Sequence, residues 1–392
     1  MIFLGCLFDK KNEESILNKS KLGVSNAVNT FQWNLIDGFN ANLEKPVDII
    51  NVLPIGVYPF QYKQLFLKTK KWQYNGSSNI EVGSINIPFL KQFSRKQKIK
   101  KLLKKTEDKN IIVYSTYLPF LKAIEKLDKS YNITLVVADL PEFYDFGKIS
   151  SLKRFLRKQN NKQIYKTLNR VDKFVLLTEQ MKYPLQVGER PYTVVEGIAN
   201  GLEESFNKSL NKKVVFYAGS LRYVFGIKTL LDGFCMTTNE DYELWLCGRG
   251  DAEEEIKELA EKDKRIKFFG FCSKQRVNEL QQQATVLVNP RKNEGEYTKY
   301  SFPSKTMEYL VAGKPVLMYK LDGVPGEYDK YLNYITGNEP EDIKKSLEVL
   351  LEKPEQELTK LAEEAKQWVL EEKSSIKQTE KIIRMVFNDK NW

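Results

Sequence analysis

The sequence predicts an α/β protein with two Rossmann-like domains, each a parallel, doubly wound sheet covered by helices. Three observations predict this fold. Short apolar runs alternate with helical patterns in both halves of the chain, which is typical of parallel sheets. The length of 392 residues, 42% of them apolar, suits two domains rather than one. A polar, turn-rich segment, residues 199–212, separates the two patterns and is the expected linker.

Strand-like apolar runs in the first half lie at residues 1–8, 47–52, 111–114, 133–137, 174–177 and 192–195. Helical patterns between several of them indicate the crossover connections of a parallel sheet. One such helix follows Gly23, and its apolar side comprises Val24, Ala27, Phe31, Leu35 and Ile36. A glycine at the start of that helix lets a ligand approach the backbone, so Gly23 is a candidate acceptor or membrane contact.

The second half repeats the pattern. The segment 214–222 is a strand that runs into Gly219, and a helix is expected from Gly226 to Phe234. The next strand leads into Gly248 and Arg249, again followed by a helix. The remaining expected elements are strands at 266–270, 285–289 and 316–319, a helix at 273–283, and helices over 341–388.

Composition excludes several classes of site. The chain has no histidine, which rules out imidazole-based triads and histidine-bearing metal sites. The cysteines Cys6, Cys235, Cys247 and Cys272 have no CxxC spacing, which favours reduced thiols in a cytosol over a zinc site. No signal peptide is predicted, and no run approaches the roughly 18 apolar residues of a membrane span. We therefore expect a cytoplasmic protein without a metal cofactor.

The most informative stretch is residues 289–319, which reads as strand, loop, helix and strand. The helix is expected to begin near Phe302, with Ser301 as its cap and Pro303 in its first turn. Gly313 ends it and Pro315 prevents its continuation. A helix would thus begin beyond the carboxyl end of a parallel strand, where open α/β sheets bind ligands.

The start of this helix predicts an anion site. Free amides of the first turn and the helix dipole favour a phosphate, and Lys305, next to Ser304, adds a full charge. Glu308, one turn further on, is suited to accept two hydroxyls of a ribose. Together they indicate a nucleoside diphosphate carrying a sugar. The alternative is that Glu308 is a solvated helix residue and that residues 301–304 form an ordinary cap.

Glu308 followed by Gly-Lys-Pro-Val at 313–316 resembles the retaining, nucleotide-sugar-dependent glycosyltransferases of family four, which have the GT-B fold. Those enzymes carry two glutamates eight positions apart in this loop, but here Tyr300 stands at the first position. Glu294 keeps the expected spacing from the preceding strand, which implies an insertion of about six residues. Whether Glu294, Glu296 or Tyr300 contacts the donor sugar stays open at this point.

The resemblance implies the domain roles and the reaction. Residues 1–205 would bind the acceptor, residues 206–370 would bind the nucleotide sugar, and a helix in 371–392 would cross back to the first domain. The run SFPSKTMEYL is similar to a subgroup common in bacterial capsule and exopolysaccharide clusters. The implied function is metal-independent transfer of a sugar, with retention, from a nucleotide sugar, expected to be a UDP-sugar, to a lipid-linked or saccharide acceptor in cell-surface polysaccharide synthesis.

The resemblance also implies a set of site residues. The family places an arginine and a lysine in the loop after the first strand of the second domain, where they neutralise the diphosphate. Here Ser220 and Phe225 occupy the nearest positions, and Arg222 and Lys228 lie close by; the alternative for both is surface charge. The donor candidates are Gly219, Ser220, Gly248, Arg249, Ser301, Phe302, Ser304, Lys305 and Glu308. The catalytic candidates are Arg222, Lys228, Glu294 and Asp139.

Asp139 follows the apolar run 133–137 and precedes Pro141. A carboxylate there is a candidate to orient or deprotonate the acceptor hydroxyl. The alternative is a helix cap or turn residue.

Charge is divided unevenly along the chain. Residues 1–212 hold 34 Lys and Arg against 20 Asp and Glu, net +14, and the remainder holds 28 against 31, net −3. The segment Lys91–Lys105 has eight basic residues, no acidic one, and Ile99, Leu102 and Leu103 at helical spacing. It predicts a basic amphipathic helix for an anionic membrane surface, contacted through Lys100, Lys101, Lys104 and Lys105.

A second basic cluster, Lys153–Lys166, includes Phe155 and Leu156. The expected location is therefore peripheral, on the inner face of the plasma membrane. The alternative is a solvated helix that packs on the sheet through the same leucines.

Two other functions are alternatives. A nucleotide-sugar epimerase of the same fold is disfavoured by the missing histidine and the basic helix. A non-enzymatic polyanion or nucleic-acid binder is suggested by the sequence pI of about 9.1, but no motif of a known nucleic-acid module is present. We therefore expect no nucleic-acid partner.

Overall fold

The computed structural model describes residues 1–9, 12–21, 26–143, 150–201 and 211–388. Its contacts divide the chain into two units. Unit 1 comprises Met1–Ile198 with Ser375–Trp392, and unit 2 comprises Ala199–Ser374. The sequence analysis put the divisions at 205/206 and 370/371. The first of these, like most of the expected linker and like Gly23, lies outside the described residues.

Unit 1 is built on an eight-stranded sheet. Its strands are β1 (Ile2–Gly5), β2 (Asp48–Asn51), β3 (Lys70–Tyr74), β4 (Ser77–Glu81), β5 (Asn110–Tyr114), β6 (Asn132–Val137), β7 (Lys173–Leu176) and β8 (Tyr192–Val194). Their order is β3-β4-β2-β1-β5-β6-β7-β8, and all pairs are parallel except β3 with β4. The order reverses between β1 and β5, as in a doubly wound sheet.

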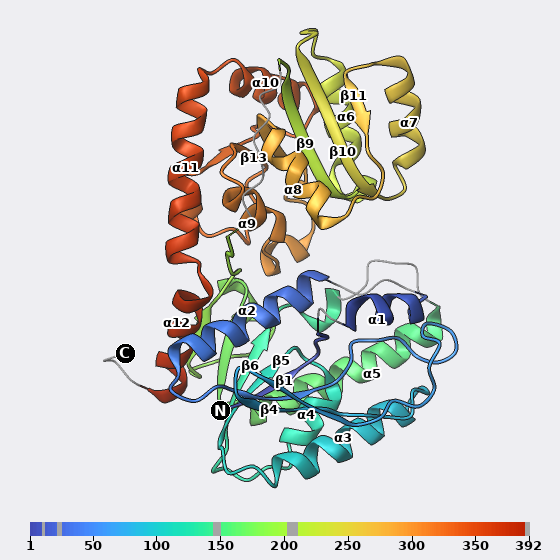
Figure 1. Ribbon diagram of the computed structural model, residues 1–392, viewed down its shortest axis with the longest axis vertical. Coiled ribbons are helices and arrows are strands. Elements are labelled where there is room, and N and C mark those ends of the chain that lie inside the picture. Colours follow the sequence, from blue (N-terminus) through green and yellow to red (C-terminus); the bar gives the residue numbers. More distant parts are fainter. Residues whose placement is uncertain (10–11, 22–25, 144–149, 202–210, 389–392) are drawn as a thin grey trace. The chain divides into compact units, whose positions relative to one another are not determined.

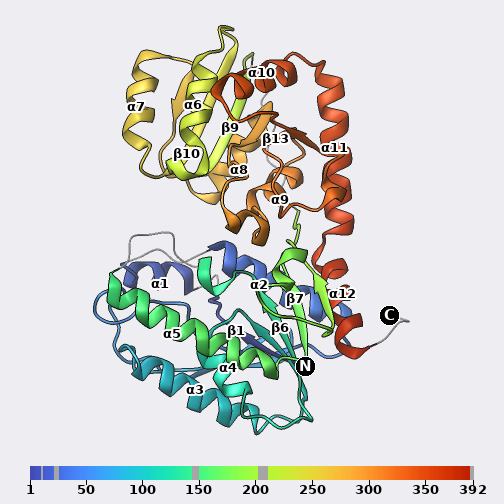
Figure 2. The same ribbon diagram turned by 180° about the vertical axis from the view of Figure 1, so that it is seen from behind.

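Helices cover both faces of this sheet (Figure 1). They are α1 (Glu13–Lys19), α2 (Asn26–Asn42), α3 (Leu90–Leu103), α4 (Leu118–Ile124), α5 (Ser151–Thr167) and α12 (Ser375–Phe387). On one face α2 packs against α12, and on the other α3, α4 and α5 lie side by side, as the view from behind also shows (Figure 2). Short 3-10 helices occur at Pro141–Phe143, Leu168–Arg170 and Glu179–Lys182.

Unit 2 has a six-stranded, wholly parallel sheet. Its strands are β9 (Lys213–Ser220), β10 (Tyr242–Arg249), β11 (Ile266–Phe268), β12 (Val286–Asn289), β13 (Val316–Met318) and β14 (Leu332–Tyr334). The order β11-β10-β9-β12-β13-β14 is the 3-2-1-4-5-6 order of a dinucleotide-binding fold. The inner strands are almost completely buried, because helices lie on both faces.

The helices of unit 2 are α6 (Ile227–Cys235), α7 (Glu253–Lys262), α8 (Lys274–Gln283), α9 (Ser304–Val311), α10 (Pro340–Leu351) and α11 (Glu355–Glu372). Their starts follow local chemistry. The hydroxyl of Ser273 accepts a hydrogen bond from the Arg276 amide, 3.2 Å, at the start of α8. Glu339 and Asp342 form a reciprocal capping box at the start of α10. The 3-10 helices are Tyr223–Phe225, Glu296–Tyr300 and Gly326–Tyr328.

The predicted fold class, α/β with two parallel Rossmann-like sheets, is confirmed. The β3–β4 hairpin was not predicted, although its turn, Asn75-Gly76, carries a strong hairpin signal. Both turn residues have positive φ angles, 47° and 84°, as a type I′ turn requires. The hairpin adds an antiparallel edge to a sheet that was expected to be parallel throughout.

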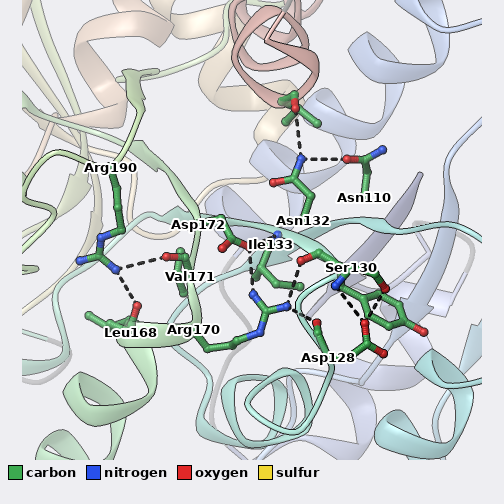
Figure 3. A network of polar contacts seen from close by, with 12 residues as sticks. Asn110, Asp128, Ser130, Asn132, Ile133, Leu168, Arg170, Val171, Asp172 and Arg190 are labelled. Carbon is green, nitrogen blue, oxygen red and sulfur yellow. Dashed lines mark hydrogen bonds and ion pairs between the residues drawn. The ribbon is translucent and has the colours of Figure 1, made fainter.

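A polar network fastens the end of α12 to the amino-terminal edge of the unit 1 sheet (Figure 3). The side-chain amide of Asn132 donates to the Asn110 side chain at 2.8 Å and to the Val386 carbonyl at 3.1 Å. The ammonium of Lys173 donates to the carbonyls of Met385 and Val386 at 2.8 and 2.7 Å. The last turn of α12 therefore satisfies its free carbonyls within unit 1.

Beside these contacts, the guanidinium of Arg170 holds the neighbouring chain in place (Figure 3). It forms an ion pair with Asp172 at 2.9 Å and donates to the carbonyls of Asp128 and Tyr131 at 2.7 and 2.9 Å. The turn before β6 and the entry to β7 are thereby joined.

Replacing Ile383 by alanine is expected to reduce the unfolding free energy of unit 1 by roughly 2–5 kcal/mol, because its side chain is fully buried among core residues. Ile376 lies on the same helix but is half exposed, so Ile376→Ala is the matched control and should cost much less. Urea unfolding followed by circular dichroism measures both. Equal effects of the two changes would mean that α12 is not part of the unit 1 core.

Candidate active site

The candidate site lies at the carboxyl ends of the unit 2 strands. The strand order reverses between β9 and β12, and ligands of doubly wound sheets bind in the crevice at such a reversal. Three segments meet there: the end of β9, the loop after β12, and the first turn of α9, which packs against β12 and β13. Most of the predicted donor residues belong to these segments.

Two glycines allow the strand ends to approach closely. Gly248 is paired in register with Gly219, and a methyl group on Gly248 would stand 1.7 Å from the Gly219 carbonyl oxygen. Gly226 has a φ of 82°, and a methyl group there would stand 1.9 Å from the carbonyl oxygen of Pro290. Glycine is therefore required at both positions, because any larger residue would separate the strand ends.

Lys305 is the central cation of the site. Its side chain passes so close to Gly219 that a methyl group there would stand 2.3 Å from Cε. The ammonium lies 5.8 Å and 5.9 Å from the ring centres of Tyr217 and Tyr309. Burial lowers the pKa of Lys305, and the charge of Glu308 opposes this in part.

Within the described ranges, no carboxylate forms an ion pair with the ammonium of Lys305. A desolvated ammonium that forms no ion pair has a strong preference for an anionic ligand. Lys305 is therefore suited to bind a phosphate.

The helix start differs from the prediction by two residues. α9 begins at Ser304, not near Phe302. Its N-cap is Pro303, whose side chain has no atom that can accept a hydrogen bond from the free amides. Ser301 does not cap the helix; its hydroxyl accepts a hydrogen bond from the Arg291 guanidinium at 3.1 Å. No side chain caps the first-turn amides of α9. The amide of Thr306 donates to the Pro303 carbonyl at 2.9 Å, and those of Ser304 and Lys305 are left available to a ligand.

Phe302 was predicted to contact the donor, but its side chain is buried in the unit 2 core. Its ring packs on Tyr328, with 5.3 Å between ring centres. Ser304 and Glu308 have exposed side chains on α9. The carboxylate of Glu308 forms no hydrogen bond or ion pair to other described residues, so it remains open to a ligand.

Arg291 is a second cation of the site, and the sequence analysis missed it. Its guanidinium lies 4.6 Å from the ring centre of Tyr297 and 5.9 Å from that of Phe225. Its Nε is buried and has no hydrogen-bond partner in the described part of the chain. Its charge also acts on Tyr217, the neighbour of Lys305. One feature of the sequence could have identified Arg291 as a site residue: it directly follows the proline that ends a buried strand.

Arg222 and Lys228 have different environments. Arg222 lies in the loop after β9, is half buried, and makes no side-chain hydrogen bond or ion pair to the residues described. Lys228 is engaged by two carboxylates, Asp232 at 2.6 Å and Glu255 at 2.8 Å, which raise its pKa above the usual range. The geometry therefore brings Arg222, and not Lys228, to the site as an available cation.

The acidic loop after β12 is exposed. Glu294 and Glu296 both have exposed carboxylates, and Glu296 accepts a hydrogen bond from the Tyr300 hydroxyl at 3.3 Å. Gly295 between them has a φ of 88°, which favours glycine. Asn293 fixes the loop by exchanging hydrogen bonds of 2.9 and 3.2 Å with Asp322. No contact made by the loop distinguishes Glu294 from Glu296 as the residue nearer the donor sugar.

The remaining predicted donor residues lie at the ends of β9 and β10. Ser220 is exposed, and its carbonyl accepts a hydrogen bond from the Tyr217 hydroxyl at 3.0 Å. Arg249 is exposed, and its guanidinium lies 4.8 Å from the ring centre of Phe271. Both border the same strand ends as Gly219 and Gly248.

Two predictions concern unit 1. Asp139 is exposed just beyond the carboxyl end of β6. On α3, Lys101 is exposed and Lys100 is half buried, and Lys104 and Lys105 are exposed just beyond its end. Ile99 and Leu103, however, are fully buried. Ile99 and Leu103 are thus covered within unit 1, where α3 packs against α4, so this part of the apolar face is not open to a membrane. Contact through the four lysines stays a prediction.

Among the described residues, no group of acidic or cysteine side chains is arranged to hold a metal ion. Nor is any described helix long and apolar enough to cross a membrane.

Comparison with known proteins extends these findings. Residues 201–368 match the family described as Glycosyl transferases group 1. A search of curated protein sequences found no match. The chain is similar in structure to the lipopolysaccharide outer core galactosyltransferase WaaB in its apo form, at 15% identity, a TM-score of 0.64 and 99% coverage of both chains.

Two further solved structures share this fold. Sucrose-phosphate synthase from Thermosynechococcus elongatus has 12% identity and a TM-score of 0.67, covering 99% of this chain and 100% of that one. HepE from Anabaena, in complex with UDP, has 14% identity and a TM-score of 0.62, with the same coverage. At these identities the likeness establishes the fold alone, which is the two-domain GT-B arrangement.

Lys305→Met is expected to weaken UDP binding at least tenfold, about 1.4 kcal/mol, because it removes the desolvated ammonium held beside Gly219. Isothermal titration calorimetry measures the affinity. Lys360→Met, an exposed lysine of α11 with no ion pair to described residues, is the control and should leave the affinity unchanged. If both variants bind UDP equally well, the phosphate does not lie at Lys305.

Proposed function

We propose that this glycosyltransferase, whose second unit is a group 1 glycosyl transferase domain, moves a sugar with retention from a UDP-sugar to a lipid-linked or saccharide acceptor. Unit 2 would bind the nucleotide sugar and unit 1 the acceptor. The reaction would require no metal. The pathway would be synthesis of a cell-surface polysaccharide, such as a capsule or exopolysaccharide.

One observation carries the proposal: Lys305 is held without an ion pair, within the described chain, at the start of α9 beside the ends of β9 and β12. A diphosphate bound there would meet the ammonium and the uncapped amides of the helix together. Arg291 and Arg222 supply two further guanidiniums on the neighbouring loops. This charge is suited to a leaving group that gains negative charge in the transition state.

Glu308 would orient the nucleoside. Its exposed carboxylate is one helical turn beyond Lys305, so a nucleotide whose phosphate contacts Lys305 would bring its ribose hydroxyls within reach. The charge of Glu308 also acts on Lys305. A carboxylate this close would weaken binding of free phosphate, so the pair favours a phosphate that carries a sugar with hydroxyls.

In the proposed reaction, the bond between the sugar C1 and the diphosphate oxygen breaks while a bond forms from C1 to the acceptor oxygen on the same face. The acceptor proton would pass to the departing diphosphate oxygen, as the resemblance to family four implies. Arg222, Arg291 and Lys305 would stabilise the diphosphate, and Glu294 or Glu296 would contact the sugar. Lys228 is left out because two carboxylates already balance its charge.

The acceptor class is supported less directly. WaaB is a galactosyltransferase of the lipopolysaccharide outer core, and HepE was solved with UDP. The UDP bound to HepE agrees with a UDP-sugar donor, and the activity of WaaB on the lipopolysaccharide outer core agrees with a cell-surface glycan acceptor. Asp139, exposed at the carboxyl end of β6, is the candidate to orient the acceptor hydroxyl.

The experiment that tests the function is a thermal-shift screen of nucleotide sugars, followed by transfer assays with the sugar that binds. A ligand at 100 times its dissociation constant stabilises the protein by about 2.7 kcal/mol, which is easily detected. A UDP-sugar is expected to give the largest shift. A protein stabilised by none of the nucleotide sugars would not be the proposed transferase.

Glu308→Gln should lower kcat/KM for the nucleotide sugar at least tenfold, roughly 1.4 kcal/mol, while leaving unfolding unchanged, because the exposed carboxylate has no structural partner among the residues described. Initial rates of UDP release measure the effect. Glu363→Gln, an exposed residue of α11, serves as control. Unchanged kinetics in Glu308→Gln would exclude the proposed ribose contact.

Sugar transfer should continue in the presence of EDTA, because the diphosphate charge would be balanced by Arg222, Arg291 and Lys305 rather than by a cation. The measurement compares rates with EDTA and with added Mg²⁺ or Mn²⁺. A strict requirement for either ion would contradict the proposed charge balance.

A further inference from the structure

We propose that a cavity of unit 1 binds a sugar residue of the acceptor that carries an acidic group, either a carboxylate or a phosphate. The inference rests on the proposed function and deepens it, because it gives the chemical class of the acceptor. Among the residues that line the cavity, called the edge pocket below, are Lys19, Tyr62, Lys68, Lys70 and Glu81.

The edge pocket lies at the carboxyl edge of the unit 1 sheet. Glu81 is the last residue of β4, and Leu53, which also lines the pocket, follows the end of the parallel strand β2. Lys70, the first residue of the antiparallel strand β3, is paired directly with Glu81. Open α/β sheets bind ligands beyond the carboxyl ends of their strands. The pocket therefore has a usual ligand-binding position.

Backbone contacts hold the walls of the edge pocket together. Ser20, directly after α1, forms an antiparallel bridge with Tyr62, which brings the end of α1 and Lys19 to the pocket. Leu53 is fixed from α3, where the buried guanidinium of Arg95 donates to the Leu53 carbonyl at 3.0 Å. Segments distant in sequence thus form one preformed cavity.

Two polar groups at the pocket have no partner among the residues that the structure describes. The carboxylate of Glu81 forms no hydrogen bond or ion pair with them. The hydroxyl of Tyr62 forms no hydrogen bond with them either, although this side chain is only 2% exposed. Burial raises the pKa of both groups, and the charge of Glu81 raises that of Tyr62 further. Because desolvated polar groups are normally hydrogen-bonded, both are suited to meet a ligand.

The size and the polar groups of the pocket suit part of a sugar ring. The cavity has a volume of about 80 Å³. A single water molecule needs roughly 10–15 Å³, so the pocket has room for a larger group. A carboxylate accepts hydrogen bonds from two hydroxyls, and a phenol hydroxyl both donates and accepts. Glu81 and Tyr62 are therefore suited to the hydroxyls on one edge of a sugar.

Charge identifies the kind of sugar. Lys19, Lys68 and Lys70 are exposed at the pocket and form no ion pair with described residues. The acidic side chains that line it are Asp9 and Glu81, so three basic groups face two acidic ones. An anionic group on the sugar would form charge-assisted hydrogen bonds with these lysines. A cationic amino sugar, in contrast, would meet three like charges.

The position of the edge pocket also sets a minimum length for the acceptor. Asp139, the candidate to orient the reacting hydroxyl, lies beyond β6, four strand spacings from the β4 strand that carries Glu81. At the usual spacing of about 4.8 Å, the two strands are roughly 19 Å apart. One sugar is shorter than this distance. The acidic residue would therefore lie several sugars away from the hydroxyl that reacts.

Binding of the full chain to a glycan array tests the proposal without a sugar donor. The array presents tetrasaccharides that are neutral, or that carry one glucuronate, one glucose 6-phosphate or one glucosamine residue. We expect binding to the glucuronate or the phosphate glycans, weakened by salt, and the glycan that binds identifies the anion. Absence of binding, equal binding of neutral glycans, or a preference for glucosamine glycans would overturn the proposal.

Two variants locate the site, with isothermal titration calorimetry of the acidic tetrasaccharide that the array selects. Glu81→Gln should weaken binding at least tenfold without lowering the free energy of unfolding, because it removes a desolvated charge that has no partner in the described chain. Lys68→Gln with Lys70→Gln should weaken binding at least tenfold and remove the advantage over the matched neutral glycan.

Lys71→Gln is the matched control and should bind like the parent. Lys71 is exposed on β3 next to Lys70, but its side chain points to the opposite face of the sheet and does not line the pocket. If either Glu81→Gln or the double lysine variant binds as tightly as the parent, the acidic sugar does not occupy the edge pocket.

The test separates the edge pocket from the transfer reaction. UDP binding should be the same in the parent and in all these variants, because the substituted residues belong to unit 1. A parent that binds acidic glycans but no nucleotide sugar would contradict the proposed transferase and support the pocket. A parent that transfers sugar equally fast to acidic and to neutral acceptors would support the transferase and overturn the pocket.

Discussion

The structure of unit 2 depends on the close contact between the ends of β9, β10 and the loop after β12. At Gly248 and Gly226 there is no room for a side chain, because the carbonyls of Gly219 and Pro290 occupy the space. This contact brings Lys305 beside β9 and Arg291 beside Phe225, in the loop that follows β9. The charge of the site thus follows from backbone packing, and a larger residue at either glycine would move both cations.

A consequence for stability accompanies this arrangement. In the described chain Lys305 is desolvated without an ion pair and the Nε of Arg291 is buried without a hydrogen-bond partner, which disfavours the folded state in the absence of a ligand. The protein tolerates this because its two sheets bury large, separate apolar cores. Lys228 and Arg170, in contrast, are paired with carboxylates. Lys305 and Arg291 lie where an anionic substrate would supply the missing charge.

The residue patterns predicted the fold class and the helix whose start forms the candidate site. Both rest on local signals, namely the alternation of apolar runs with helical patterns and the Gly-Lys-Pro-Val strand that follows the helix. They did not predict Arg291 as a site residue or Lys228 as a paired one, since both depend on which side chains meet after folding. Ile99 and Leu103 show the same limit: a basic amphipathic helix looks alike in sequence whether its apolar face packs on a sheet or on lipid. The Asn75-Gly76 hairpin, in contrast, was locally encoded and could have been found.

The return of α12 to unit 1 has a consequence for the order of folding. Asn42 of α2 donates to the Ile376 carbonyl at 2.9 Å across a sequence separation of 334 residues, so unit 1 closes with some of the most distant contacts in the chain. Unit 2 is continuous from Ala199 to Ser374 and has all its strands in one segment. During synthesis, unit 1 is translated first, but it is completed only after unit 2 has emerged. Until then, the α2 surface that receives α12 is uncovered. Because α2 is among the first elements to be synthesised, the nascent chain is exposed to aggregation through this surface for most of its synthesis.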